Sequence, residues 1–457
     1  MTILWLTLSL LVLDPTEPLI TRADLARALV RFEGAWRAAG RAPEEVERVN
    51  RAFDAVTLSF FGGRLGEAIG DLERLTASIR GEPDRAELAA WRARLEPPVW
   101  VSGSKAPTLK LERLYESAVA SPPDVVVRHE SGAPEIRLGG EDGHSWIDDP
   151  KLPHGRYELH LKRDGLSVVV GHWFVVAESL DAVRRRNEKK LAQLTFRDPP
   201  RQQALASTRA RNELLSDRPS SSSTTQARMD LFSLQLQVAE EIEALAKGEN
   251  PFRGRAGDTW RVFVHDGREH PLRIHAPSAV AERSAAAPLV IVCHGAGGDE
   301  NMFFDAYGEG EIRRLAEEHG FLVASPSTLS LARDPEVFDA IVRGSSLDYW
   351  IDPKRVYVIG HSMGAGVVAE LAVRRSDRIA AAVCIAGGGR FSAGQAPTLV
   401  IAAELDPLAA PARLEAATRT AAEAGAPVEY RLAKGYGHTL VVGDSLAEVV
   451  DWLLRER

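Results

Sequence analysis

Apolar residues change their spacing several times along the 457-residue chain. From residue 21 to 96 they recur three and four positions apart, as in RADLARALVRFEGAW, which predicts a helical region. From 97 to 177, short alternating runs such as DVVVRHE and RYELHLK are separated by Gly, Pro and Asp, which is typical of a small β-sandwich-like module. Helical spacing returns from 178 to 250, in a connector interrupted by the polar tract RPSSSSTTQ, which we expect to be a flexible loop.

The pattern changes again in residues 255–457. Continuous apolar runs such as PLVIVC, RVYVIG and AAAVCIAG alternate with helical segments such as EIRRLAEEHG. Runs that are apolar at every position are typical of parallel strands covered by helices on both faces. A hairpin precedes them, since Asp266 and Gly267 separate two strand-like runs. We therefore predict an α/β domain with a doubly wound, mostly parallel sheet.

The first twenty residues contain an apolar stretch from Ile3 to Leu13. It is too short to span a bilayer but suits the apolar part of a secretory signal, although no Lys or Arg precedes it and no clear cleavage site follows. Residues 1–20 are thus a candidate signal or leader, and a buried first helix is the alternative. The first interpretation predicts an extracytoplasmic or secreted protein, the second a cytoplasmic one. Neither interpretation includes a stable membrane span.

Composition narrows the class of function. The chain is 45% apolar and 26% charged, with a formal net charge of −8, which suits a globular protein and argues against nucleic-acid binding. The two cysteines, Cys293 and Cys384, lie in apolar runs, so no disulfide framework is expected. His265, His270 and His275 resemble a ligand series, but the odd spacing of five residues sends His270 and His275 to opposite faces of a strand, which argues against a metal site. No metal or organic cofactor is implied.

A single serine marks the candidate chemistry. Ser362 stands in GHSMG, directly after a strand-like run and before a helical one. Glycines on both sides of such a serine allow a sharp turn that holds the hydroxyl above the end of the sheet. Ser362 is therefore the candidate nucleophile. The alternative is a serine that only forms a turn. This alternative is disfavoured because a strand-like run precedes Ser362 and a helical run follows it.

Two further residue types complete a nucleophilic system. His438, in the glycine-rich loop KGYGHT after the last strand, is the candidate base. The loop AELDP after the preceding strand offers Asp406 as the acid that orients it, with Glu404 as the alternative. The order serine, acid, histidine is the one that this type of sheet requires.

Backbone amides are the candidate oxyanion donors. Met363 follows the serine at a helix N-terminus, and Ala296 lies in the glycine-rich turn HGAGG after another strand. Nucleotide binding is the rival interpretation of that turn. It is disfavoured because Glu300 stands where a dinucleotide fingerprint needs glycine.

Together, HGAGGDENMFFDAYGEG and GHSMGAG resemble α/β-hydrolases, in particular esterases of the polyhydroxybutyrate depolymerase and feruloyl esterase kind. The resemblance covers only residues 255–457. It implies a carboxylic ester hydrolase that works through an acyl-enzyme on small-molecule or polymer-end esters. A serine peptidase of the prolyl-oligopeptidase type and a non-catalytic binding protein on the same fold are the alternatives.

Two expectations concern access to the site. Only about ten residues connect the strands around AAAVCIAG and PTLVIAA, too few for an inserted lid, so the site is expected to be open. The C-terminal part has its own strands and helices, so we expect a chain beginning near Phe252 to fold and act alone. The oligomeric state is left open by the sequence.

Overall fold

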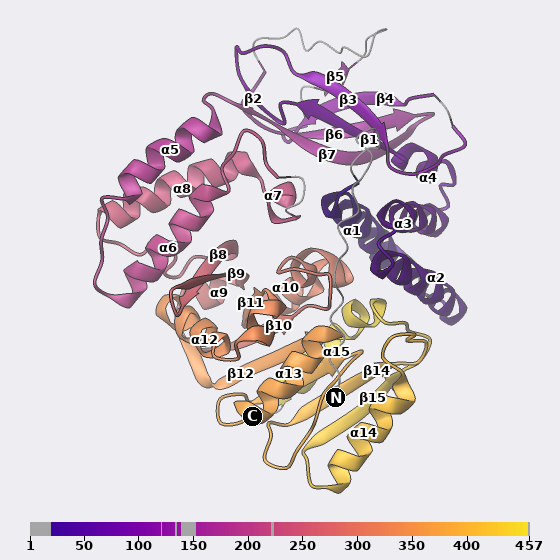
Figure 1. Ribbon diagram of the computed structural model, residues 1–457, viewed down its shortest axis with the longest axis vertical. Helices are drawn as coiled ribbons and strands as arrows, with labels where there is room; N and C mark the ends of the chain where they lie inside the picture. Colours follow the sequence, from indigo (N-terminus) through magenta and orange to yellow (C-terminus); the bar gives the residue numbers. More distant parts are fainter. Residues whose placement is uncertain (1–19, 120, 133–134, 139–151, 221–223, 456–457) are drawn as a thin grey trace.

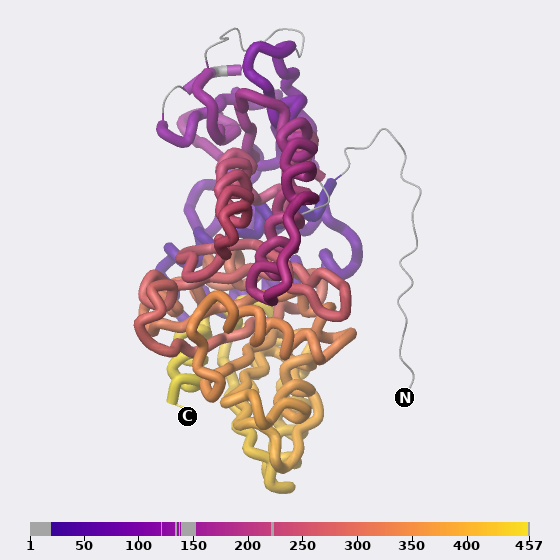
Figure 2. Tube along the Cα trace, turned by 90° about the vertical axis from the view of Figure 1, so that its left-hand side faces the viewer, coloured from indigo at the N-terminus to yellow at the C-terminus, as the bar shows by residue number. Residues whose placement is uncertain are grey.

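The computed structural model describes residues 20–119, 121–132, 135–138, 152–220 and 224–455. The candidate leader, apart from Ile20, lies outside them. The β module and the large C-terminal sheet occupy opposite ends of the molecule, as Figures 1 and 2 show. Two groups of helices lie between these ends, the N-terminal helices on one side and the connector helices on the other (Figure 1). Within the described part of the chain, no helix has both the length and the apolar character needed to cross a bilayer.

The N-terminal region is helical as predicted, and it consists of α1 (Arg22–Ala38), α2 (Pro43–Phe61), α3 (Leu65–Arg80) and α4 (Asp84–Ala89). Thr21 begins α1 with a capping box, in which its side chain and that of Asp24 bond each other's backbone N–H. The last residues assigned to this helical region form a strand instead, β1 (Trp91–Glu96). The reason is a period of two, which places Ala93 and Leu95 in the core of the β module.

The β module contains a five-stranded sheet with the order β2-β7-β6-β4-β5. Its strands are β2 (Val99–Val101), β4 (Asp124–His129), β5 (Glu135–Leu138), β6 (Gly155–Arg163) and β7 (Leu166–Val176). A separate antiparallel pair, β1 with β3 (Thr108–Arg113), shares the core around Tyr157 and Trp173. The predicted sandwich-like module is thus confirmed.

The connector contains α5 (Leu180–Leu191), α6 (Pro199–Glu213), α7 (Thr224–Arg228) and α8 (Leu231–Ala246). Its polar tract was expected to be a flexible loop, but the end of the tract that the structure describes is docked on the C-terminal domain. Thr225 Oγ1 donates to Glu300 Oε1 over 2.7 Å, and beyond the tract Arg228 pairs with Asp305 at 2.8 Å. The tract is docked because the carboxylates of Glu300 and Asp305 bind one of its side chains and that of Arg228. The sequence pattern does not show that these carboxylates lie nearby.

The C-terminal sheet has eight strands in the order β15-β14-β13-β12-β10-β11-β9-β8. They are β8 (Gly257–His265), β9 (Arg268–Ala276), β10 (Ala287–Cys293), β11 (Leu322–Pro326), β12 (Ile351–His361), β13 (Ala381–Ile385), β14 (Thr398–Ala403) and β15 (Val428–Ala433). Strands β8 and β9 form the predicted hairpin, with positive φ at Asp266 and Gly267. The β8–β9 and β9–β11 pairs are antiparallel and the other pairs are parallel, so this mostly parallel sheet is the predicted α/β-hydrolase fold.

Helices cover both faces of this sheet. The helical segments are α9 (Ser278–Ala281), η1 (Met302–Ala306), α10 (Tyr307–His319), α11 (Thr328–Arg333), α12 (Val337–Asp348), α13 (Met363–Arg374), α14 (Pro411–Glu423) and α15 (Leu440–Arg455). One core contains Phe338 of α12 and Val368 of α13, and the other contains Ile312 of α10 and Val449 of α15. The doubly wound arrangement follows from these two separate cores.

The N-terminal helices share a core with the C-terminal domain. Leu440, at the start of α15, is buried in the same cluster as Phe32 of α1 and Phe53 and Val56 of α2. The expectation that the C-terminal part folds alone did not include this shared core. Removing the N-terminal helices would expose Leu440 to water, at a cost in stability.

Candidate active site

Ser362 lies in the sharp turn that the sequence predicts. β12 ends at His361 and α13 begins at Met363, and Ser362 between them has φ 54° and ψ −114°. A Cβ at Gly360 would lie 2.2 Å from the carbonyl oxygen of Gly364. A Cβ at Gly364 would lie equally close, 2.2 Å, to the carbonyl oxygen of Cys293. Both positions therefore require glycine for the turn to close.

The structure brings the predicted serine, histidine and aspartate together. His438 Nε2 is 2.9 Å from Ser362 Oγ, and His438 Nδ1 is 2.8 Å from Asp406 Oδ2. The other oxygen of Asp406 accepts the backbone N–H groups of Leu408 and Ala409, each over 2.8 Å. The carboxylate is thereby fixed with one oxygen directed at the imidazole, and it can hold the ring in a single tautomer.

Glu404, the alternative acid, has a different place. Its side chain is exposed, and its Oε2 accepts the backbone N–H of Gly435 over 2.8 Å. The carboxylate therefore supports the start of the loop that carries His438 rather than the imidazole itself.

The two amides predicted as oxyanion donors flank Ser362. Met363 is the first residue of α13, where the N–H has no partner within the helix. Ala296 lines the same cavity as Ser362 and His438. His294 fixes the loop of Ala296, since its Nε2 accepts the N–H of Thr328 over 3.1 Å and its Nδ1 donates to the carbonyl of Gly295 over 2.8 Å.

His361 is a neutral supporting residue. Burial lowers its pKa to about 3, so the ring carries one proton at neutral pH. Tyr307 Oη donates to Nδ1 over 2.7 Å, which leaves the proton on Nε2, and Nε2 donates to the carbonyl of His438 over 3.0 Å. His361 thus holds the backbone of the predicted base.

Sequence reasoning missed two residues of α2 that contact the same loop. Asn50 Oδ1 accepts the N–H of Gly437 over 2.8 Å, and Asp54 Oδ1 accepts the N–H of His438 over 2.9 Å. No spacing pattern links residues almost four hundred positions apart. One signal could have pointed to them: Asn50 and Asp54 are polar residues four positions apart on an amphipathic helix, and both are buried.

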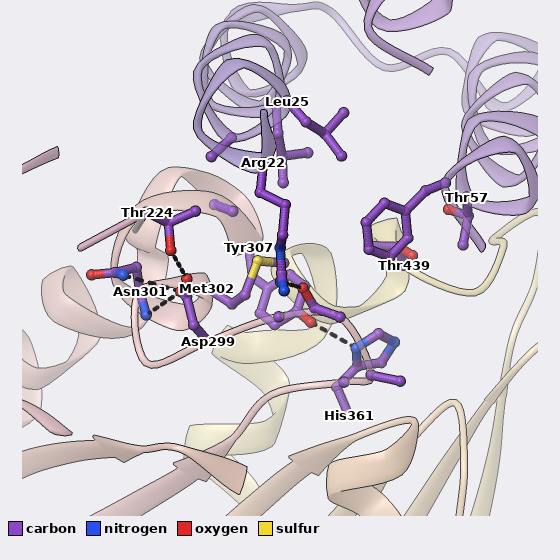
Figure 3. A pocket seen from close by; sticks show the side chains of 18 of the residues that line it. Arg22, Leu25, Thr57, Thr224, Asp299, Asn301, Met302, Tyr307, His361 and Thr439 are labelled. Carbon is purple, nitrogen blue, oxygen red and sulfur yellow. Dashed lines mark hydrogen bonds between the residues drawn. The ribbon is translucent and has the colours of Figure 1, made fainter. Parts of the chain in front are cut away.

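A cavity of about 150 Å³ opens beside Ser362 and His438. The N-terminal helices form one wall of it, and Figure 3 shows Arg22 extending from α1 toward Tyr307, with Leu25 beside the same helix. Apolar side chains dominate this wall: Leu25, Ala26, Leu29, Val30, Phe53, Val56, Phe60, Phe61 and Leu72. The expectation of an open site did not include this wall. The connection between β13 and β14 is short, as predicted, but α1 and α2 supply the cover.

The helices of this cover dock through a buried acid. Glu33 of α1 accepts the N–H of Gly308 over 3.2 Å, at a turn where Gly308, Glu309 and Gly310 all have positive φ. Burial and the nearby charge of Asp444 raise the pKa of Glu33 to about 8.

Because the folded protein binds this proton more tightly than the unfolded chain, Glu33 makes stability fall as pH rises from about 5 to about 8. We expect Glu33→Gln, which keeps an acceptor for Gly308, to reduce this loss by about 2–4 kcal/mol. Urea unfolding of both proteins across that pH range measures the difference. Parallel pH profiles for the two proteins would contradict the burial of an ionising Glu33.

Two of the three histidines of the hairpin lie beside separate acids. His275 Nδ1 lies 2.6 Å from Asp258 Oδ1, whereas His265 Nε2 lies 3.3 Å from Asp334 Oδ2. These two histidines therefore have acidic partners of their own, whereas His270 Nε2 accepts or donates no hydrogen bond within the described residues.

Comparison with known proteins finds one family over part of the C-terminal domain. Residues 326–419 match a family model described as PET hydrolase-like. No curated protein matches the sequence. Among solved structures, a thermostable esterase is 24% identical over 44% of this chain and 63% of its own length, with a TM-score of 0.38. This chain therefore spans less than two thirds of that esterase.

Two other similar structures match more of their own length. An S-formylglutathione hydrolase from Staphylococcus aureus is 15% identical over 44% of this chain and 98% of its own, with a TM-score of 0.36. A ferulic acid esterase is 12% identical over 45% of this chain and 99% of its own, with a TM-score of 0.37. The strand order, the serine turn and the family match over residues 326–419 together support the α/β-hydrolase fold of the C-terminal domain.

Proposed function

We propose that the protein is a carboxylic ester hydrolase in which Ser362, His438 and Asp406 form the catalytic triad. The observation that carries the proposal is the unbroken chain of hydrogen bonds from Ser362 Oγ through both imidazole nitrogens to a fixed carboxylate, at 2.9 and 2.8 Å. Such a chain lets a neutral imidazole accept a proton from the hydroxyl while the carboxylate stabilises the resulting imidazolium.

The reaction follows from these roles. Ser362 Oγ attacks the ester carbonyl carbon as His438 Nε2 takes the hydroxyl proton. The N–H groups of Met363 and Ala296 hold the oxyanion of the tetrahedral intermediate. The intermediate collapses to an acyl-enzyme, and the leaving alcohol takes the proton from His438. Water then attacks the acyl-enzyme with His438 as base, which releases the acid and restores Ser362.

The cavity suggests the size of the substrate. Its apolar wall favours an apolar acyl or alcohol group, since burying each methylene there contributes about 0.8 kcal/mol. A cavity of about 150 Å³ matches one aromatic ring, because an engineered protein cavity of that volume binds benzene. Small esters and the ends of ester polymers fit this description, whereas a long acyl chain exceeds the cavity.

A panel of nitrophenyl esters with acetyl, butyryl, hexanoyl, benzoyl and lauroyl groups tests the function, with a nitroanilide peptide alongside. We expect kcat/KM to be highest for the butyryl, hexanoyl and benzoyl esters and to fall at least tenfold for lauroyl, whose tail cannot be buried. Cleavage of the peptide in preference to every ester would favour the peptidase alternative. Inertness toward all substrates, with no labelling by a fluorophosphonate, would leave only the binding-protein alternative.

A further inference from the structure

We propose that Asn50 and Asp54 of α2 are positioning residues of the active site, which hold the loop carrying His438 so that its imidazole meets Ser362. This inference rests on the proposed function of Ser362 and His438. It assigns the N-terminal helices a part in catalysis itself, beyond covering the cavity.

The hydrogen bonds of the loop carry the inference. The loop runs between β15, which ends at Ala433, and α15, which begins at Leu440. Asn50 and Asp54 accept two successive N–H groups of this loop, those of Gly437 and His438. Both side chains are nearly inaccessible, with exposed fractions of 1% and 6%. In this closed environment, water cannot replace a lost acceptor.

His438 is held on its other side as well. Its carbonyl accepts the Nε2–H of His361, so both backbone polar groups of the predicted base are bonded to side chains. Gly437 allows this close approach, because a Cβ there would lie 2.1 Å from Asp54 Oδ2. The imidazole position is therefore set jointly by the C-terminal domain and by α2.

The same helix forms the cavity wall. Phe53 and Val56, next to and two positions beyond Asp54, line the cavity and pack in the core that contains Leu440. Displacement of α2 would therefore open the cavity and release the loop of His438 together. Turnover therefore requires α2 to be docked on the C-terminal domain.

Asp54 can carry a negative charge, and the test must separate the effect of this charge from the effect of the hydrogen bond that the side chain accepts. Burial raises its pKa to about 6, and the backbone N–H of His438 acts in the opposite direction. The charged groups that influence it are Asp406, His438 and Arg51. Asparagine at position 54 would keep the acceptor oxygen without the charge, whereas leucine would remove both at similar volume.

The experiment uses the full chain with Asp54→Asn and Asp54→Leu, and Glu47→Leu as the matched control on the exposed face of α2. We expect Asp54→Leu to lower kcat on the best ester about 100-fold with KM nearly unchanged, since misplacing a catalytic group by about 1 Å costs this much. Asp54→Asn is expected to stay within about threefold of wild type, and Glu47→Leu to be unaffected. The rate of fluorophosphonate labelling of Ser362 should follow the same order.

A folded Asp54→Leu protein with wild-type kcat would overturn the inference, as would an Asp54→Asn protein impaired as severely as Asp54→Leu. If Asp54→Leu does not fold, Asn50→Leu tests the acceptor of the Gly437 N–H in its place, with the same expected loss of kcat and the same Glu47→Leu control. Failure of the proposed function has a separate signature, because wild type would then neither cleave esters nor be labelled. If the wild-type protein is labelled by the fluorophosphonate but cleaves none of the esters, the labelling rates of the variants still test the positioning role.

Discussion

Replacing Ser362 with alanine is expected to lower kcat/KM for the best ester by roughly 10⁴- to 10⁶-fold, because it removes the hydroxyl that bonds His438 Nε2 and forms the acyl-enzyme. The fold should survive, since the serine side chain is only partly buried and its hydroxyl bonds to His438 rather than to the core. The measurement is steady-state ester turnover beside a thermal unfolding curve. Labelling by a fluorophosphonate should disappear together with turnover.

Ser376 offers the matched control. It is exposed at the end of the helix that follows the serine turn, so Ser376→Ala should keep both turnover and labelling. A folded Ser362→Ala protein that retains near-normal turnover would show that another residue is the nucleophile. The proposed mechanism would then be wrong at its first step.

The sequence was sufficient to predict the C-terminal fold and the three residues that meet there. β10 is apolar and buried at every position, and β12 has an unbroken apolar run from Val356 to Gly360, a pattern typical of strands covered on both faces. The carboxyl ends of parallel strands meet at one edge, so the order Ser362, Asp406, His438 already implied proximity. The choice between Asp406 and Glu404 depends on the path of the backbone in the turn, and only the structure gives this path.

The cover over the site was beyond the sequence for a physical reason. The pattern of α1 and α2 reports that each helix has an apolar face but not which surface that face meets. Leu25 and Phe53 read as ordinary core positions, yet they line the cavity beside Ser362. The same holds for Asn50 and Asp54, whose hydrogen-bond partners lie at the other end of the chain.

The β module braces this cover. Arg92 of β1 forms a buried ion pair with Asp24 of α1 at 2.7 Å, and Arg31 of α1 donates to the carbonyl of Val169 in β7 over 3.0 Å. Removing one partner of a buried ion pair leaves an uncompensated charge, so α1 depends on the β module for its place. The upstream modules thus form one continuous support from the β module through α1 and α2 to His438.

Asp406→Asn is expected to lower kcat/KM by about 10⁴-fold, nearly as much as loss of the histidine. The reason lies in the turn, where the N–H groups of Leu408 and Ala409 both bond Oδ1. In the substituted protein these two donors retain the amide oxygen, so the amide NH₂ faces Nδ1 of His438. The imidazole then carries its proton on Nε2, where it cannot accept the proton of Ser362.

Glu404→Gln is the matched control for this substitution. It makes the same carboxylate-to-amide change two residues away, and its remaining oxygen can still accept the N–H of Gly435, so we expect turnover within about twofold of wild type. Measuring kcat/KM for both variants across pH 5 to 9 separates the two acids. The assignment of Asp406 requires a large loss for Asp406→Asn alone, and the opposite ranking would transfer the orienting role to Glu404, since these are the two acids in the loop that follows β14.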